Sequence, residues 1–206
     1  YSKDNGFRYE KSTQAYRQHL RRIIESFGPR HIMDLCCGSG DVTGPLTDKF
    51  TVFGVDAVER SCILASQNGL SVECCKLNDY TASRKFDLVL CCEAITLLDK
   101  PQQLFDFFQK FSDSDGYLVI AFVNMDSIIR KMFNFIFIRG SKSQQSVDKY
   151  SFDLLNELAN TNNLKLVQTD YILQYAFGAL GFSANKNWKL SRLLATNLIL
   201  SYQKDV

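Results

Sequence analysis

The stretch Asp-Leu-Cys-Cys-Gly-Ser-Gly-Asp (DLCCGSGD, residues 34–41) follows a short apolar segment and turns on two glycines. Glycines at this spacing allow a polar ligand to lie directly against the backbone, because no side chain stands in the way. Two kinds of ligand fit such a turn, namely the pyrophosphate of a dinucleotide and a ligand that carries no phosphate. The residues on either side of the turn distinguish between them.

The dinucleotide fingerprint G-x-G-x-x-G is incomplete in this turn. Gly38 and Gly40 fit its first two positions, but Thr43 occupies the third and Gly44 comes one position late. Asp34, just before the turn, would repel a phosphate and attract a sulfonium or ammonium cation. The turn therefore favours a cationic ligand over a phosphate, and a nicotinamide dehydrogenase is the weaker alternative.

Apolar strands alternate with helices around this turn. The nearly all-apolar strands DLVLCC and YLVIAF indicate burial on both faces, which is typical of a parallel, doubly wound sheet. The C-terminal third differs, since a helix capped by Ser151 precedes two strands joined by a long connection. The predicted helices are 12–27, 41–49, 59–68, 101–111 and 149–161, and the predicted strands are 31–37, 51–57, 71–79, 86–94, 116–124, 164–173 and 193–203.

The length of 206 residues predicts a single α/β domain spanning 1–206. Within it we expect an N-terminal helical segment (1–28), a lid-like insertion (125–150) and a C-terminal helix with a strand pair (151–206). Because the chain begins with Tyr1 rather than Met, we expect it to be trimmed at its N-terminus.

Charge and cysteine content exclude several classes of protein. A net charge of +2 does not predict nucleic-acid binding, and no apolar run reaches the roughly 20 residues of a membrane span. Six of the seven cysteines form adjacent pairs, at 36–37, 74–75 and 91–92, and no CxxC occurs. We therefore expect no metal site and no disulfide framework, but buried thiols in a reducing cytoplasm.

Two further acids follow predicted strands. Asp56 ends the strand 51–57 and is placed to accept hydrogen bonds from both hydroxyls of a ribose. Asp79, flanked by Asn78 and Tyr80, ends the strand 71–79 and is placed to accept from the exocyclic amine of an adenine, with Leu77 or Tyr80 against the ring. Since ligands bind at the carboxyl ends of strands in open α/β sheets, these acids and Asp34 predict one ligand site.

Four segments in order, DLCCGSGD, VFGVDA, LNDY and FDLVLCCEAITLLDKP, resemble the consecutive motifs of class I S-adenosylmethionine-dependent methyltransferases. The resemblance covers residues 12–124 and implies a Rossmann-like sheet of seven mostly parallel strands with the last strand antiparallel. It also implies S-adenosyl-L-methionine as cofactor and S-adenosyl-L-homocysteine as product. The cofactor-binding residues predicted from the motifs are Asp34, Cys36, Gly38, Ser39, Gly40, Asp56, Ala57, Asn78, Asp79, Tyr80 and Cys92.

The chain departs from the resembled family at two positions. Relatives usually carry glycine where Cys36 stands, and small-molecule relatives often hold a histidine where this chain has Thr96. No residue is therefore assigned a catalytic role. These departures also keep a second hypothesis open, a non-catalytic module of the same fold that acts through a protein partner.

The segments that follow the strand 86–94 bear on the methyl acceptor. No Asn/Asp-Pro-Pro-aromatic motif ends the strand 86–94, and no proline precedes Cys91 or Cys92, which argues against methylation of nucleic-acid bases. Glu93 is either a base or orienting group, or a solvated carboxylate. Residues 125–140 contain an apolar helical face, which either packs in the core, covers an apolar acceptor as a lid or contacts a membrane surface. The loop around Trp188 forms either a wall of the acceptor pocket or a surface connection. We expect a small organic or lipid-like acceptor.

Overall fold

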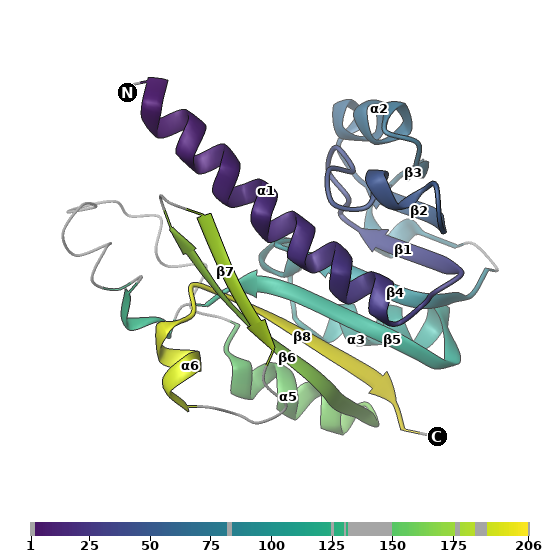
Figure 1. The fold of residues 1–206 in the computed structure, drawn as a ribbon. Helices are drawn as coiled ribbons and strands as arrows, with labels where there is room; N and C mark the ends of the chain where they lie inside the picture. The colour runs from purple at the N-terminus through teal and green to yellow at the C-terminus, as the bar shows by residue number, and fades with distance from the viewer. Residues whose placement is uncertain are drawn as a thin grey trace.

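The computed structural model describes residues 3–81, 84–124, 126–129, 131, 150–175, 178–183 and 189–205. Eight strands in this part of the chain form one sheet with helices on both faces (Figure 1). The strands are β1 (His31–Leu35), β2 (Thr51–Asp56), β3 (Ser71–Cys74), β4 (Phe86–Cys92), β5 (Ser112–Val123), β6 (Leu164–Tyr175), β7 (Gly178–Ser183) and β8 (Asn197–Lys204). The helices are α1 (Lys3–Ser26), α2 (Glu59–Gln67), α3 (Gln102–Phe111), α5 (Phe152–Thr161) and α6 (Lys189–Leu194), and 3₁₀ turns span Gly44–Leu46, Leu77–Asp79 and Ile95–Leu97.

The strand order β3-β2-β1-β4-β5-β8-β6-β7 confirms the doubly wound sheet. Neighbouring strands from β3 to β5 pair in parallel, whereas β8, the last strand, pairs antiparallel with both β5 and β6. The winding direction reverses between β1 and β4. Open α/β sheets bind ligands at the carboxyl ends of the strands beside such a reversal, so the topology directs attention to the segments that follow β1, β2 and β4.

The sheet contains one strand more than the seven expected. β7 pairs antiparallel with β6, from Asp170 opposite Ser183 to Tyr175 opposite Gly178, and forms the edge of the sheet. Its sequence, GALGFS, has two glycines and no alternation of polar and apolar residues, so the pattern alone predicts a connection there. α1 lies along β7 and β6 and begins at Lys3, earlier than the pattern predicts (Figure 1).

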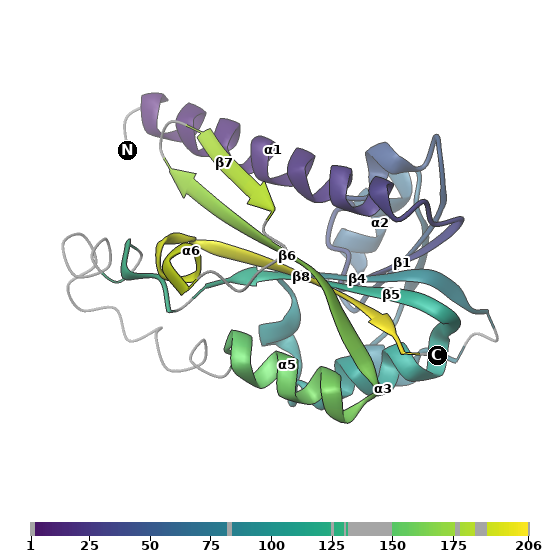
Figure 2. The same cartoon turned by 60° about the horizontal axis from the view of Figure 1, so that its bottom comes forward.

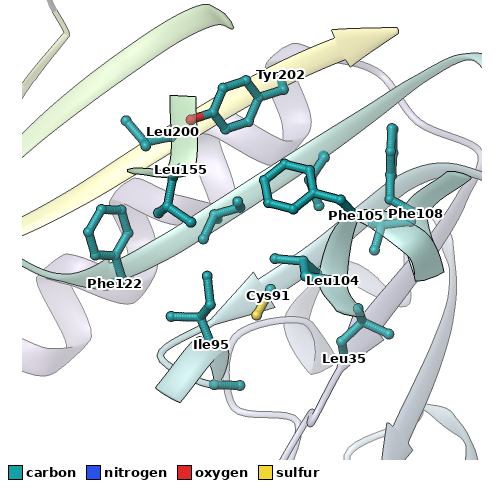
Figure 3. Close-up of a cluster of buried hydrophobic side chains, with 14 of the residues drawn as sticks. Leu35, Cys91, Ile95, Leu104, Phe105, Phe108, Phe122, Leu155, Leu200 and Tyr202 are labelled. Carbon is teal, nitrogen blue, oxygen red and sulfur yellow. The ribbon is translucent and has the colours of Figure 1, made fainter. Parts of the chain in front are cut away.

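Helices cover the two faces of the sheet with separate apolar cores. α1 and α2 lie on one face and α3 and α5 on the other (Figure 2). On the first face, Tyr16, Leu20, Ile23 and Ile24 of α1 are buried, so this side of the helix packs on the sheet. On the second face, aromatic residues of α3 meet side chains of α5 and β8, as Figure 3 shows.

The predicted α-helix at residues 41–49 is wrong. Turns and the 3₁₀ helix Gly44–Leu46 take its place, because Pro45 has no backbone N–H to donate and Gly44 is a poor helix former. β3 is also shorter than predicted, since it ends at Cys74 and the chain then reaches Asp79 through the 3₁₀ turn Leu77–Asp79.

Most of the expected insertion at 125–150 and all of 184–188, including Trp188, lie outside the described residues. At the near end of that insertion, Asn124 follows β5 and is buried. Its side-chain amide donates to the carbonyl oxygens of Arg192 and Ala195, and its backbone N–H donates to that of Thr196. These bonds hold the segment between α6 and β8 against the carboxyl end of β5.

Replacing Ser151 with alanine should destabilise the protein by about 1 kcal/mol, the usual cost of losing an N-cap. Ser151 Oγ accepts a hydrogen bond of 3.2 Å from the backbone N–H of Leu154, which confirms the predicted cap of α5. The free energy of unfolding from urea titrations would measure the loss. Ser66→Ala, on the exposed side of α2, is the matched control and should change stability little. Equal effects of the two changes would contradict the capping role.

Candidate active site

Asp56, the last residue of β2, holds the glycine turn in place. Its Oδ2 accepts from the backbone N–H of Gly38 at 2.9 Å, and its Oδ1 accepts from that of Val58 at 2.9 Å. A carboxylate has about four lone-pair sites, so both oxygens can still accept from a ligand. Asp56 therefore links the turn after β1 to the end of β2, as the prediction of a shared site requires.

Gly38 and Gly40 adopt the left-handed backbone, with φ of +56° and +74°. A Cβ placed on Gly38 would meet no other atom within 4 Å, so open space lies over the turn beside Asp56. A Cβ on Gly40 would instead lie 3.0 Å from Leu70 Cδ1. Gly38 thus leaves room for a ligand, whereas Gly40 allows the turn to pack on the segment behind it.

Asp34 is buried at the end of β1 and receives a 2.6 Å hydrogen bond from Thr43 Oγ1. Burial raises the pKa of Asp34 to about 7; the bond from Thr43 opposes this rise and the nearby charge of Asp56 adds to it. Asp34 is therefore close to half-ionised at neutral pH. A cation bound over the turn would favour its charged form.

Cys36 adopts a left-handed backbone, with φ of +54°, at the position where relatives of the resembled family carry glycine. Burial, followed by the charges of Asp56 and Asp34, raises the pKa of its thiol to about 11. A left-handed conformation costs a residue with a side chain roughly 1–2 kcal/mol. The turn is therefore strained at Cys36, whose side chain lies near both Asp34 and Asp56.

The adjacent Cys37 explains the glycine in the middle of β2. The backbone N–H of Cys37 donates to Val55 O at 3.1 Å. A Cβ on Gly54 would lie only 2.7 Å from Cys37 Sγ. Neither Cys37 nor Gly54 is given a role by the sequence pattern, because their packing depends on the tertiary structure.

The residues that follow β2 and β3 are only partly arranged as predicted. Ala57 is exposed beside Asp56, and Asn78 and Asp79 are exposed in the 3₁₀ turn after β3. The ring of Tyr80 is buried with Phe107 and Phe111, at centroid distances of 5.7 and 5.0 Å. It is therefore not available to stack on an adenine, which leaves the half-buried Leu77 for that contact.

The end of β4 meets α1 at a cluster that sequence reasoning missed. Tyr16 of α1 is buried, and its hydroxyl lies 3.9 Å from Cys92 Sγ. Burial first, then the neighbouring Cys92 and Glu93, raises the pKa of Tyr16 well above its usual value. Glu93 is exposed and has φ of +55°. Tyr16 is recognisable in the sequence only as one of several apolar positions of a helical stripe.

Two arginines of α1 hold the segment that replaces the predicted helix 41–49. Arg17 Nη2 pairs with Asp41 Oδ2 at 2.9 Å, and Arg21 Nε donates to Val42 O at 3.0 Å. On the other side of the turn, Asn68 Nδ2 donates to Ser39 O at 2.8 Å. The turn is thus braced by side chains rather than by the start of a helix.

The thiols of β4 are poor nucleophiles. Burial raises the pKa of Cys91 and of Cys92 well above the usual range, and negative neighbours, Glu93 and Asp34 beside Cys92, act in the same direction. Nucleophilic cysteines require the opposite surroundings. Within the described residues, no group of three or more His, Cys, Asp or Glu side chains is placed to hold a metal ion, and no described helix is long and apolar enough to cross a membrane.

Asp34→Asn should remove a pH dependence from the stability of the protein. The pKa of Asp34 is about 7 in the folded state and roughly 3.9 in an unfolded chain. At a pH between these two pKa values, Asp34 is protonated in the folded state and ionised in the unfolded state. The free energy of unfolding of the wild-type protein therefore falls by about 1.4 kcal/mol per unit rise in pH. Above about pH 7 the loss is complete, and it is absent below about pH 4.

Urea denaturation of both proteins between about pH 4.5 and pH 8 would measure this difference. The amide oxygen of the substituted side chain can still accept from Thr43, so the variant should fold and gain stability over the wild type as the pH rises. Parallel stability curves for the two proteins would show that Asp34 does not titrate in this range.

A doubly wound sheet with acidic residues and a bare glycine turn at its carboxyl edge defines a nucleoside-binding α/β protein. The family described as "Methyltransferase domain" matches residues 8–169, and the chain belongs to this family. It is an S-adenosylmethionine-dependent methyltransferase, and the open turn at Gly38 beside Asp56 fits this cofactor.

Several known proteins are similar to this chain. The ubiquinone biosynthesis O-methyltransferase of Rickettsia akari is 24% identical over 93% of this chain and 75% of its own length. A methyltransferase of Thermotoga maritima, described as a possible histamine N-methyltransferase, superposes with a TM-score of 0.75 at 15% identity, covering 97% of this chain and 92% of its own. The magnesium protoporphyrin IX methyltransferase of Synechocystis, with S-adenosylhomocysteine bound, gives 0.68 at 14% identity, covering 95% and 86%.

Proposed function

We propose that this enzyme transfers the methyl group of S-adenosylmethionine to a small organic or lipid-like acceptor at the carboxyl edge of the sheet. The observation that carries the proposal is the open space over Gly38, bounded by a carboxylate that already orders the turn. The R. akari relative is by name an O-methyltransferase, which supports an acceptor that presents a hydroxyl oxygen.

In this proposal each edge residue contacts one part of the donor. Gly38 and Gly40 lie beneath the methionine and ribose portions, and Asp56 accepts from the ribose hydroxyls. Asp79 accepts from the adenine amine, and Leu77 lies against the ring. Cys36, Ser39, Ala57, Asn78 and Cys92 complete the wall of the site, with Asn78 and Ala57 at its exposed rim.

The donor supplies an electrophilic methyl group on a sulfonium, and the protein contributes alignment and charge. Asp34 and Asp56 place negative charge at the turn, which favours the cationic donor over the neutral thioether product. Tyr16 stays protonated at neutral pH because its pKa is raised, so it offers a hydrogen-bond donor and not a base. Glu93 is the exposed carboxylate at the end of β4 and the candidate group for orienting the acceptor.

The same proposal places the enzyme in the cytoplasm, because all seven cysteines are free thiols. A proteomic fraction that contained the protein only outside the cell would contradict this location.

Two measurements test the proposed function. Calorimetry should detect binding of S-adenosylmethionine and of S-adenosylhomocysteine to the purified chain. Incubation of the chain with a metabolite extract and methyl-labelled donor, followed by mass spectrometry, should then place the label in a small or lipid-soluble product. Label found only in protein or nucleic acid would overturn the proposed acceptor class, and absence of donor binding would overturn the proposed site.

A further inference from the structure

Two cysteines on neighbouring elements both lie next to Asp56. Cys62 is in the first half of α2, which packs on β2 and β3, and Cys74 is the last residue of β3 (Figure 1). Cys74 pairs in register with Asp56 across the sheet. The thiol of Cys62 donates to Asp56 O at 3.3 Å, and the neighbouring Cys74 is among the groups that raise the pKa of Cys62.

We propose that Cys62 and Cys74 form a reversible disulfide under peroxide, and that this modification weakens binding of the methyl donor. The first part rests on the shared neighbour Asp56, since Cys62 of α2 is hydrogen-bonded to its carbonyl oxygen and Cys74 lies opposite it in β3, on which α2 packs. A disulfide would then bring the two sulfurs to about 2.05 Å. The second part rests on the proposed function of Asp56, whose backbone carbonyl oxygen accepts a hydrogen bond from Cys62.

The reaction divides between an exposed and a buried thiol. Cys74 is exposed, and its thiolate attacks hydrogen peroxide to give a sulfenic acid and hydroxide. The sulfur of Cys62, which is buried, then displaces water from that sulfenic acid. In total, two thiols and one peroxide give one disulfide and two waters, and thiol reductants reverse the step. Burial raises the pKa of Cys62 to about 12, so the second step depends on proximity and should be slow.

Neighbouring cysteines provide internal comparisons. Cys75 is adjacent to Cys74, but its thiol donates to Glu73 Oε1 at 3.7 Å. Cys36 and Cys91 are near each other in space, yet Cys91 is buried with no exposed thiol to react first. The pair 62–74 combines an exposed thiol with a buried one beside the same aspartate.

The disulfide should affect the donor site through Asp56. Once Cys62 is bonded to Cys74, it no longer has a proton to donate to Asp56 O. Asp56 also anchors Gly38, so the turn loses part of its support. We expect the dissociation constant of S-adenosylmethionine to rise about 2- to 12-fold, the size expected for one neutral hydrogen bond.

The test uses the full chain treated with hydrogen peroxide, then digested without reductant. Cleavage after Arg60, Glu73 and Lys76 places Cys62 in peptide 61–73 and both Cys74 and Cys75 in peptide 74–76. We expect these peptides to be joined, with a loss of two hydrogens that dithiothreitol reverses. Cys75→Ser should keep the link, and Cys74→Ser should abolish both the link and the change in donor affinity.

Three outcomes would overturn parts of the proposal in distinguishable ways. A link that survives in Cys74→Ser, or linkage mainly between other cysteines, would refute the pair. The expected link with an unchanged dissociation constant would refute its effect on the donor. The expected link in a chain that binds no donor even when reduced would refute the proposed function and leave the disulfide standing.

Discussion

Asp56→Ala should weaken S-adenosylmethionine binding by about 10- to 150-fold, which corresponds to 1.5–3 kcal/mol for charged hydrogen bonds. In the proposed site the carboxylate accepts from the ribose hydroxyls, and alanine removes both acceptors. The same change also deletes the bonds from Gly38 and Val58 that order the turn. Calorimetric titration of both proteins, with circular dichroism to confirm folding, would measure the effect.

Two further variants separate the contributions of Asp56. Asp56→Asn keeps one oxygen acceptor and removes the charge, so its affinity should fall between those of the wild type and Asp56→Ala. Asp48→Ala, which removes an exposed acid in the segment before β2, is the charge-matched control and should bind normally. A folded Asp56→Ala protein with an unchanged dissociation constant would mean that the donor does not reach this carboxylate.

The strands and the acids at their ends could be predicted from the sequence because local patterns encode them. Apolar runs long enough to be buried on both faces, such as DLVLCC, correspond to β4, and Asp34 and Asp56 lie at the ends of β1 and β2 as predicted. The cap at Ser151 is equally local, since it involves a hydroxyl and an N–H three residues apart. Features of this kind need no knowledge of the tertiary structure.

The features that could not be predicted depend on contacts between distant segments. Tyr16 reaches Cys92 across 76 residues of sequence, and β7 is a strand because β6 offers it an edge. The segment 41–49 follows the glycine turn, where a helix is expected to open, but Pro45 and the bonds from α1 impose another conformation. Tertiary context overrides local propensity at each of these places.

Gly40→Ala should mainly reduce stability, whereas Gly38→Ala should mainly weaken donor binding. Both glycines have positive φ, so alanine carries a similar backbone cost of about 1–2 kcal/mol at either position. At Gly40 the new methyl would also lie 3.0 Å from Leu70 Cδ1 and 3.4 Å from Ala65 Cα. Adding an overpacking cost of roughly 1–3 kcal/mol, we expect Gly40→Ala to lose about 2–5 kcal/mol of stability.

Gly38→Ala should be only mildly destabilised, because its methyl would enter open space. That space is where we place the donor, so we expect its dissociation constant for S-adenosylmethionine to rise at least about 10-fold, as for the loss of close backbone approach. Urea denaturation and calorimetry on the two variants would provide both comparisons. If Gly38→Ala bound the donor as well as the wild type while remaining folded, the space over the turn would not be the donor site, whatever the behaviour of Gly40→Ala.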